Sequence, residues 1–279
     1  MAMAEIYSVF GGVRIRPVGV ALTLLCVPAC SGEGATDFDA AEEIASQSSP
    51  ITSVSQEFFW QQGQPDKFLG DANQWACFLV KVTGKFEGWG ESVFIRAVGN
   101  PFGTNLFLTG TSQQSGVSAV ARCVQRPSLQ TTTYTWDQYM GGPVDMGGGG
   151  SSRVCALTAV GGRFEAHTEF VRIQRNTQGN WFLDGGSNQH DVWGQATCFP
   201  GVTLGGEYTW QSGQAQTPMA TNPSVNSRNY CFLTHMGGRF DGASHTIFAY
   251  TTPTIENWLL NGGGSNSRQA RARCASNNI

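Results

Sequence analysis

The chain has 279 residues, including 36 glycines, and only 13% of its residues are charged, with a formal net charge of −3 at pH 7. Abundant glycine and aromatic residues, and the lack of any amphipathic run long enough for a helix, predict an all-β fold. The slightly acidic balance and the absence of a basic stripe argue against nucleic acid as a partner.

Residues 1–29 are typical of a signal peptide. Arg14 and Arg16 precede an apolar run that ends at Ala29 and is too short to cross a bilayer. The run closes on Val27-Pro28-Ala29-Cys30, which resembles the lipobox of bacterial lipoproteins. The resemblance implies that Cys30 is lipidated and becomes the new N-terminus, and an ordinary secretory signal is the alternative. We therefore expect an outer-membrane or cell-surface lipoprotein, touching the membrane only through its lipid, or an extracellular protein.

Residues 30–56 are expected to form a flexible tether. The segment is acidic, contains no Lys or Arg, and ends in a stretch rich in Ser, Gln and Pro. Few apolar residues and one sign of charge leave little to bury in a folded core. Such a spacer would hold a folded body away from a lipid anchor.

The rest of the chain consists of three tandem repeats of roughly 75 residues, over 57–126, 127–200 and 201–279. Each repeat opens with an aromatic-x-Trp sequence, closes on a cysteine, and is expected to contain about five short antiparallel strands. The repeats are joined by only about ten residues, which favours one compact pseudo-threefold body over three separate small domains.

One stretch of each repeat is the most regular. It begins at Cys77, Cys155 and Cys231 and has a Thr-Gly or Gly-Gly pair in its middle. This pattern predicts a β-hairpin with a two-residue turn, Thr83-Gly84 in the first copy. Alternation along the strands would place Cys, Leu and Phe on a core face and leave Val82, Lys85 and Glu87 on a face toward solvent.

The cysteines indicate export to an oxidising compartment. Cys26 lies in the apolar run and Cys30 at the predicted lipidation site, and the other six fall two in each repeat. Six cysteines allow 15 connectivities, among which the threefold pattern favours Cys77–Cys123, Cys155–Cys198 and Cys231–Cys274. A metal site is the alternative, but the sequence lacks the close cysteine pairs that zinc sites use, so no metal or other cofactor is expected.

No known catalytic motif is present, whether a nucleophile elbow, a phosphate loop or a metalloprotease helix. The best candidates for catalysis are carboxylate pairs, Glu87 with Glu91 and Glu165 with Glu169, because two acids can hydrolyse a glycoside. The third repeat has Asp241 and His245 instead. Since a hydrolase rarely needs three copies of its site, we predict no catalytic residue.

Aromatic residues give the best case for binding. Five tryptophans recur at equivalent repeat positions, which indicates core packing: Trp60, Trp136, Trp210, Trp181 and Trp258. Trp75, Trp89 and Trp193 do not recur, and they are candidates for stacking on sugar rings. For Trp89, packing against a neighbouring strand is an equal alternative.

The acids of the repeated stretch are candidate polar ligand contacts: Glu87, Glu165 and Asp241. We therefore expect a non-enzymatic protein that binds a glycan or another cell-surface macromolecule, with three weak sites acting together. A structural, self-associating protein of the envelope or extracellular space is the alternative. A glycan-active hydrolase is the third possibility.

Overall fold

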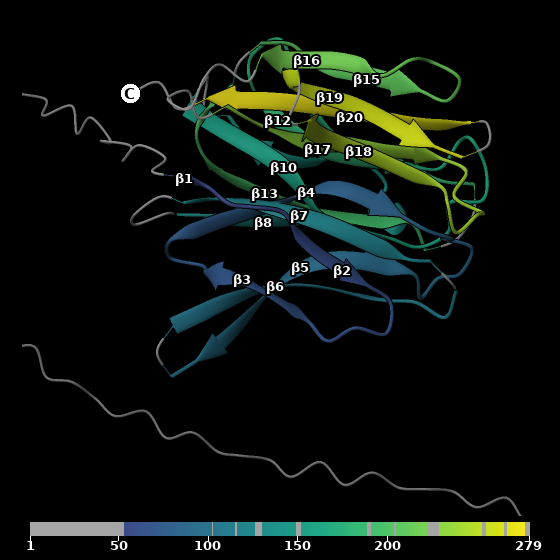
Figure 1. Cartoon of the computed structure of the whole chain (residues 1–279), viewed down its shortest axis with the longest axis horizontal. Helices are drawn as coiled ribbons and strands as arrows, with labels where there is room; N and C mark the ends of the chain where they lie inside the picture. Colours follow the sequence, from purple (N-terminus) through teal and green to yellow (C-terminus); the bar gives the residue numbers. More distant parts are fainter. Residues whose placement is uncertain are drawn as a thin grey trace, which may run out of the picture. The chain divides into compact units, whose positions relative to one another are not determined.

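Three antiparallel sheets make up the computed structural model of this protein (Figure 1). The structure describes residues 53–101, 103–114, 116–125, 130–148, 152–188, 191–203, 205–221, 229–252, 255–264 and 267–276. The predicted signal peptide, Cys30 and the tether up to residue 52 lie outside these ranges. Within them, no helix is both long and apolar enough to cross a bilayer.

Sheet A contains strands of the first and third repeats. In order across the sheet these are β1 (Ser53–Val54), β7 (Ser118–Gln125), β4 (Trp75–Thr83), β18 (Thr246–Thr252), β19 (Ile255–Gly263) and β16 (Thr217–Thr221). The strand β2 (Phe58–Gln61) also pairs with β7. Because β1 pairs with β7, residues 53 and 54 belong to the folded body, although the sequence places them in the tether.

Sheet B contains strands of the first and second repeats. Its order is β3 (Lys67–Asp71), β6 (Gly103–Thr111), β5 (Ser92–Asn100), β10 (Arg153–Gly161), β13 (Trp193–Pro200) and β8 (Thr132–Asp137). A short 3-10 helix, η1 (Gln138–Met140), follows β8.

Sheet C contains strands of the second and third repeats. Its order is β14 (Val202–Thr203), β20 (Arg268–Ser276), β17 (Tyr230–Gly238), β11 (Phe170–Arg175), β12 (Trp181–Gly186) and β9 (Val144–Gly147). The strand β15 (Tyr208–Gln211) pairs with β20.

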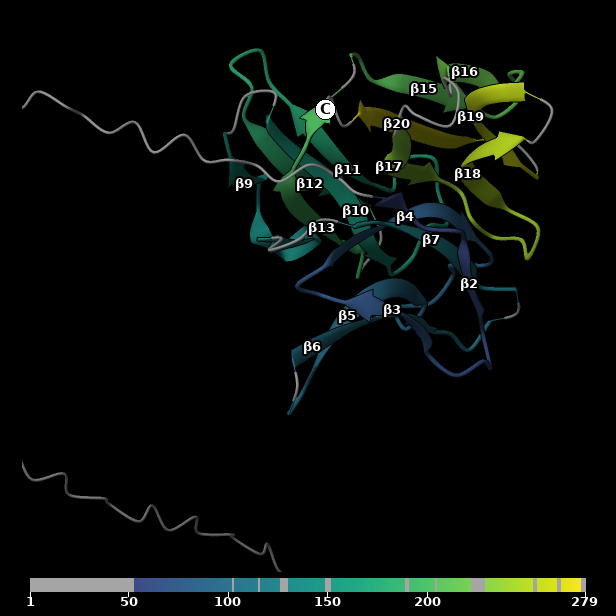
Figure 2. The same ribbon diagram turned by 60° about the vertical axis from the view of Figure 1, so that its left-hand side comes forward.

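Every sheet is therefore shared by two repeats, and every repeat divides its strands between two sheets. Figure 2 shows β3, β5 and β6 together, apart from β4 and β7 of the same repeat. The sharing is cyclic, since the third repeat pairs back onto the first through β18 and β4. This arrangement confirms the predicted all-β body of three pseudo-repeated modules. In the described residues the first and second repeats each supply six strands, β2 to β7 and β8 to β13, and the third supplies seven, β14 to β20, rather than the five expected.

Three phenylalanines meet where the three repeats converge. Phe86, Phe164 and Phe240 are fully buried, and their ring centroids lie 6.0, 6.1 and 6.1 Å apart in edge-to-face contacts. Their backbones form a closed cycle of hydrogen bonds. The N–H of Phe86 donates to the carbonyl of Phe240, Phe240 to Phe164, and Phe164 to Phe86, at 2.7, 2.6 and 2.7 Å. These residues mark the pseudo-threefold axis and tie the repeats together.

The repeated stretch is not the β-hairpin that the sequence predicts. β4, β10 and β17 are single nine-residue strands, and the chain leaves each of them toward the axis. At Gly84, where φ is +125°, an added Cβ would lie 2.5 Å from Cα of Val117. The glycine is therefore required by close backbone approach and not by a two-residue turn.

The face predicted to be toward solvent is also wrong for these strands. Val82 and its equivalents Val160 and Met236 are completely buried, as is nearly all of β17. Each of these strands has neighbours on both edges, and most of its side chains are buried on both faces. Central strands covered in this way lose the alternation of buried and exposed residues.

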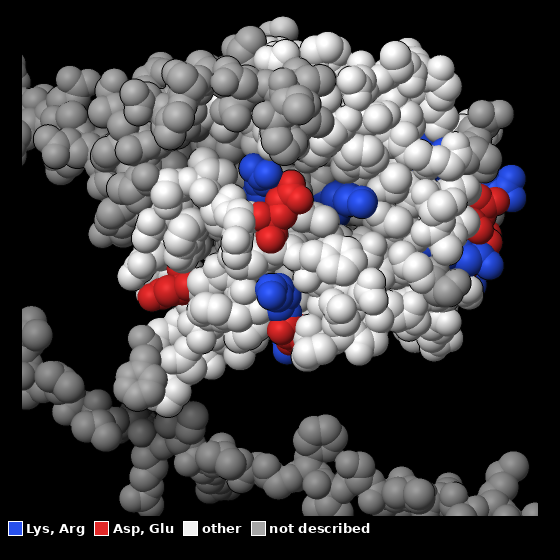
Figure 3. Space-filling model, viewed as in Figure 1, with Lys and Arg blue, Asp and Glu red and all other residues white. Residues whose placement is uncertain are grey.

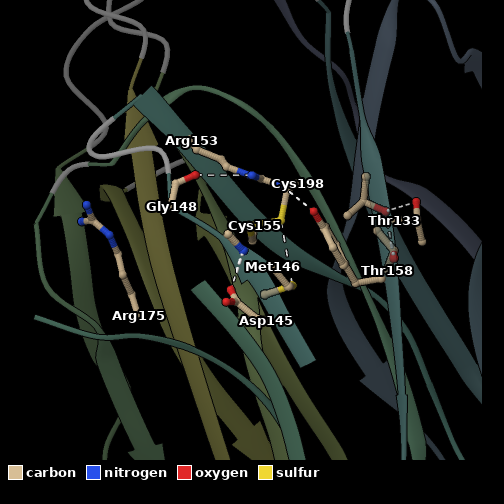
Figure 4. Close-up of a disulfide and its surroundings, with 12 residues drawn as sticks. Thr133, Asp145, Met146, Gly148, Arg153, Cys155, Thr158, Arg175 and Cys198 are labelled. Atoms are coloured by element: carbon tan, nitrogen blue, oxygen red, sulfur yellow. Dashed lines mark hydrogen bonds between the residues drawn. A yellow bond between two sulfur atoms is a disulfide. The ribbon is translucent and has the colours of Figure 1, made fainter. Parts of the chain in front are cut away.

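The three predicted disulfides are confirmed: Cys77–Cys123, Cys155–Cys198 and Cys231–Cys274. Each joins directly opposed residues of the first and last long strands of one repeat, with Cα atoms 4.0 Å apart. In Figure 4, Met146 of sheet C lies against the Cys155–Cys198 bond of sheet B, 3.9 Å from the Cys198 sulfur. Three such buried disulfides indicate an oxidising, non-cytoplasmic compartment.

The recurring tryptophans lie in the core, as predicted from their repetition. Trp60, Trp136 and Trp210 are nearly fully buried. Their indole N–H groups donate to backbone carbonyls in the turns that follow, at 3.2 to 3.3 Å. Satisfying the polar end of a buried indole in this way keeps its desolvation cost low.

Candidate functional site

Sheet B carries two neighbouring recesses on one face. The larger, of about 840 Å³, is lined by residues of β5, β6, β8, β10 and β13 and by Trp75. The smaller, of about 330 Å³, contains Trp89, Tyr139, Trp193, Thr135, Asp137 and Asp191. Alternate residues of a strand share a face, so Thr133, Thr135 and Asp137 of β8 point the same way as their partners on β13, which are Thr197, Gln195 and Trp193.

The two recesses have a continuous lining. The Gln195 side chain, in the larger recess, donates to the Thr135 hydroxyl of the smaller one at 3.2 Å. Phe94 of the larger recess packs against Trp193 of the smaller, with ring centroids 6.4 Å apart. We call the two recesses together the sheet B groove.

Two exposed aromatic side chains border the smaller recess. Trp89 is 69% exposed and Tyr139 is 67% exposed. Trp193 is half-buried and stands opposite Gly161 in the neighbouring strand, where an added Cβ would lie 2.5 Å from the indole nitrogen. The indole of Trp193 thus rests on glycine backbone, which leaves its other face available to the recess.

Tyr139 is held in place by the turn that follows β8. The Asp137 carboxylate accepts from the N–H of Tyr139 at 2.9 Å, which starts η1, and Gly141 ends it in the left-handed region at φ 71°. The N–H of Gln138 donates to the Val192 carbonyl, and the Val192 N–H donates to the Gln138 side chain. These bonds fix the turn against the start of β13.

Asp191 occupies a strained backbone position beside Tyr139. Its φ is 75°, a left-handed conformation that costs a residue with a side chain of order 1 kcal/mol. The equivalent residues are Gly116 and Ser267, also with positive φ, so the conformation is part of the repeat. The Asp191 carboxylate accepts from the Tyr139 hydroxyl at 3.2 Å. Desolvation, and then this hydrogen bond and the Asp191 charge, raise the pKa of Tyr139.

The larger recess arises because sheet B splits. β5 pairs with β10 only between Ser92–Phe94 and Ala159–Gly161. Beyond that point β5 continues with β6 as far as Asn100, while β10 continues with β13. The two pairs of strands diverge, and the space between them is the recess.

Hydroxyl groups dominate one wall of the larger recess. The hydroxyls of Thr133 and Thr158 lie 3.0 and 3.2 Å from the hydroxyl of Thr197. Figure 4 shows the Thr133 and Thr158 side chains next to each other. Trp75 lines the recess and packs over Gly70, where an added Cβ would lie 2.5 Å from its ring. Arg96 is the one charged residue in the described lining, and it forms an ion pair with Asp66.

The structure thus brings all three candidate tryptophans, Trp75, Trp89 and Trp193, to one groove. It does not bring the candidate acids there. Glu87 pairs with Lys85 at 2.8 Å, Asp241 contacts Arg239 and His245, and neither these acids nor Glu165 line a recess of the groove. They follow the axial phenylalanines in sequence, and two of them form local ion pairs.

The acids proposed as their catalytic partners are buried in the turns. Glu169 accepts hydrogen bonds from the Ala166 N–H and the Thr168 hydroxyl, and Glu91 accepts from the Gln113 N–H at 3.3 Å. The third equivalent, His245, contacts Asp241 at 3.2 Å. Glu91 and Glu169 therefore stabilise the turns that connect the axial phenylalanines to the next strand.

Sequence reasoning missed Tyr139, Asp137 and Asp191. The available signal was departure from the repeat. The turn that carries Tyr139 is two residues longer than its equivalents, because the Trp136 indole donates to Gly142 whereas those of Trp60 and Trp210 donate to Gln64 and Gln214. The equivalents of Trp89 are His167 and Ala243. The aromatic recess therefore occurs at one junction of the three, rather than at three similar sites.

No protein-family model matches the chain, and a search of curated proteins finds no match. Among the described residues, no group of three or more His, Cys, Asp and Glu side chains is arranged to hold a metal ion. Function has to be inferred from the groove itself.

Proposed function

We propose that this is an exported, non-enzymatic surface protein that binds a glycan in the sheet B groove. The observation that carries the proposal is the pair of aromatic side chains, Trp89 and Tyr139, each about two-thirds exposed at a recess that also contains Trp193. Large exposed aromatic groups around a recess with a few fixed polar atoms are typical of ligand sites.

The polar groups of the groove suit a sugar. A flat aromatic ring offers a surface for the C–H face of a pyranose, and carboxylate oxygens accept hydrogen bonds from its hydroxyls. Asp137 and Asp191 supply such oxygens in the smaller recess. The same charges would repel phosphate groups, and Figure 3 presents a surface with only scattered charges of both signs.

Binding without cleavage is favoured because both carboxylates of the smaller recess already have structural partners. Asp137 holds the N–H of Tyr139, and Asp191 holds its hydroxyl. Incubation with a bound glycan is expected to release no shorter sugar, which chromatography of the supernatant would check. If the unmodified chain releases sugar and Asp137→Asn does not, the protein is a hydrolase and the proposal of binding without cleavage is wrong.

Export is proposed from the disulfides together with the lipobox-like residues before Cys30. A lipid on Cys30 and the acidic segment behind it would present the sheets at the outer membrane or cell surface. Incorporation of radiolabelled palmitate that Cys30→Ala abolishes would support the anchor. Equal labelling of the unmodified chain and of Cys30→Ala would refute the lipid anchor.

The binding proposal is tested by titrating the exported chain against a broad glycan panel. Trp89→Ala and Tyr139→Ala are each expected to weaken affinity about fivefold or more, because stacking of a ring is worth roughly 1–3 kcal/mol by analogy with bases. Phe59→Ala is the matched control, since Phe59 is 47% exposed but lies on sheet A. No saturable binding by the unmodified chain, or equal loss in the control, would refute the proposal.

Self-association is a second candidate, favoured by a separate observation. Phe59 and Phe68 are 47% and 53% exposed and line a common recess beside β2 and β3. If this patch joins two copies, sedimentation of the chain will show concentration-dependent mass that Phe59→Ala and Phe68→Ala reduce. Trp89→Ala should leave the mass unchanged, so the two candidates are separable.

A further inference from the structure

Resting on the proposed glycan binding, we infer that the ligand is a segment of an uncharged linear polysaccharide that spans the whole sheet B groove, not a single terminal sugar. The smaller recess holds one end of the segment at Trp89, Tyr139 and Trp193. The larger recess receives the rest of it between the threonine wall and Trp75.

The direction and length of the groove support this inference. Its lining on β8 runs from Thr133 in the larger recess to Asp137 in the smaller one. At about 3.4 Å per residue, the groove follows the strand for roughly 14 Å. This length exceeds one sugar ring.

Each recess of the groove contains an aromatic platform. Trp193 rests on Gly161 in the smaller recess, and Trp75 rests on Gly70 in the larger one. In each case one face of the indole is covered by backbone and the same ring lines the groove. Two platforms separated along one groove suit stacking of two non-adjacent sugar rings of a single chain.

The side chains in the middle of the groove indicate the chemical class of the ligand. The hydroxyls of Thr133 and Thr158 each contact that of Thr197, and Gln195 adds an amide. Hydroxyls and amides both donate and accept, as sugar hydroxyls do. The guanidinium of Arg96 is engaged by Asp66, so no unpaired positive charge in the described lining calls for an anionic sugar. An uncharged glycan fits this wall.

The test is a length series. The chain is titrated calorimetrically with neutral cello-, xylo-, manno- and laminari-oligosaccharides from two to six units, and with acidic oligogalacturonides of the same lengths. For the series that binds, affinity is expected to rise at least tenfold from the shortest to the longest member. Trp75→Ala should cancel that gain and leave the short member unaffected, whereas Trp89→Ala should weaken both.

A second variant guards against misfolding of Trp75→Ala. Thr133→Val with Thr197→Val removes two hydroxyls of the wall with little change of volume, and is expected to weaken only the longer members, several-fold. Thr209→Val, on sheet C and equivalent to Thr135 of the groove, is the matched control. Thermal unfolding of each variant would verify its fold.

The outcomes separate the two proposals. Binding that depends on Trp89 but not on chain length, Trp75 or the threonine wall would overturn the extended ligand and retain a sugar site. Tighter binding of acidic oligosaccharides than of neutral ones would overturn the uncharged class. No binding in any series would overturn the proposed function itself.

Discussion

At the scale of single residues, a position that is equivalent in the three repeats can carry side chains of very different chemistry. His235 of β17 is an example, because its equivalents in the other repeats are Lys81 and Ala159. It is 4% exposed and stacks on Phe170, with ring centroids 5.8 Å apart. Burial first, and then the charges of Arg271 and Arg172, lower its pKa to about 3.

This histidine should make the protein sensitive to acid. The unfolded chain takes up a proton near pH 6.5, but the folded protein does so only near pH 3. Its full contribution to stability is therefore present above pH 6.5 and is lost as pH falls toward 3, by at most about 1.4 kcal/mol per unit. We predict that His235→Leu flattens the fall in the free energy of unfolding between pH 7 and 4.

Urea unfolding at several pH values would measure this slope. His167→Leu is the matched control, because His167 is exposed. A His235→Leu slope equal to that of the unmodified chain would contradict the prediction.

At the scale of elements, each disulfide fastens the two long strands that every repeat gives to one sheet. The paired cysteines are 46, 43 and 43 residues apart, so the three loops are almost equal in length. In the chain-entropy model, a loop of this length stabilises the folded state by about 4 kcal/mol. We predict that replacing both Cys155 and Cys198 with Ala lowers the free energy of unfolding by about that amount.

The first and third disulfides provide the comparison, since the same double replacement there should cost a similar amount. Equilibrium denaturation would measure all three. A loss well below 1 kcal/mol at one position would contradict the prediction there. It would mean that the disulfide removes little conformational entropy from the unfolded chain.

The elements also show what the sequence could predict about the fold. Strand content and disulfide pairing followed from composition and threefold spacing. The predicted hairpin at Thr83-Gly84 is absent, because a glycine such as Gly84 is equally suited to a tight turn and to close backbone contact with a remote segment. The remote segment, at Val117, lies more than thirty residues away, and local periodicity carries no information about it.

The candidate site was predictable in part for a related reason. Trp75, Trp89 and Trp193 were recognisable as aromatics that break the repeat. Their meeting in one groove depends on sheet B being built from two repeats, which the spacing did not indicate. The strained backbone of Asp191 was likewise invisible, since its repeat equivalents are a glycine and a serine.

At the scale of the whole molecule, the cyclic sharing of sheets makes the repeats depend on one another. A chain covering 53–200 keeps all strands of sheet B but leaves β4 without β18, and β11 without β17. It also lacks Phe240 of the axial ring. We predict that this fragment does not unfold cooperatively, whereas 53–279 does.

Heat capacity measurements on the two fragments would test the prediction. Adding residues 201–279 as a separate chain should restore a cooperative transition, because the disulfides lie within repeats and the seams between them are not covalent. A cooperative transition of 53–200 alone would mean that two repeats form a self-sufficient domain.

The return of β18 to β4 also governs when this protein can fold. A polypeptide is made and translocated from its N-terminus, yet the first repeat lacks its partner in sheet A until residues 246–248 have emerged. The ring of sheets therefore cannot close one repeat at a time as the chain is synthesised. For an exported protein this delay is useful, because a chain that stays incomplete until its last repeat is made remains able to thread through a membrane before it folds.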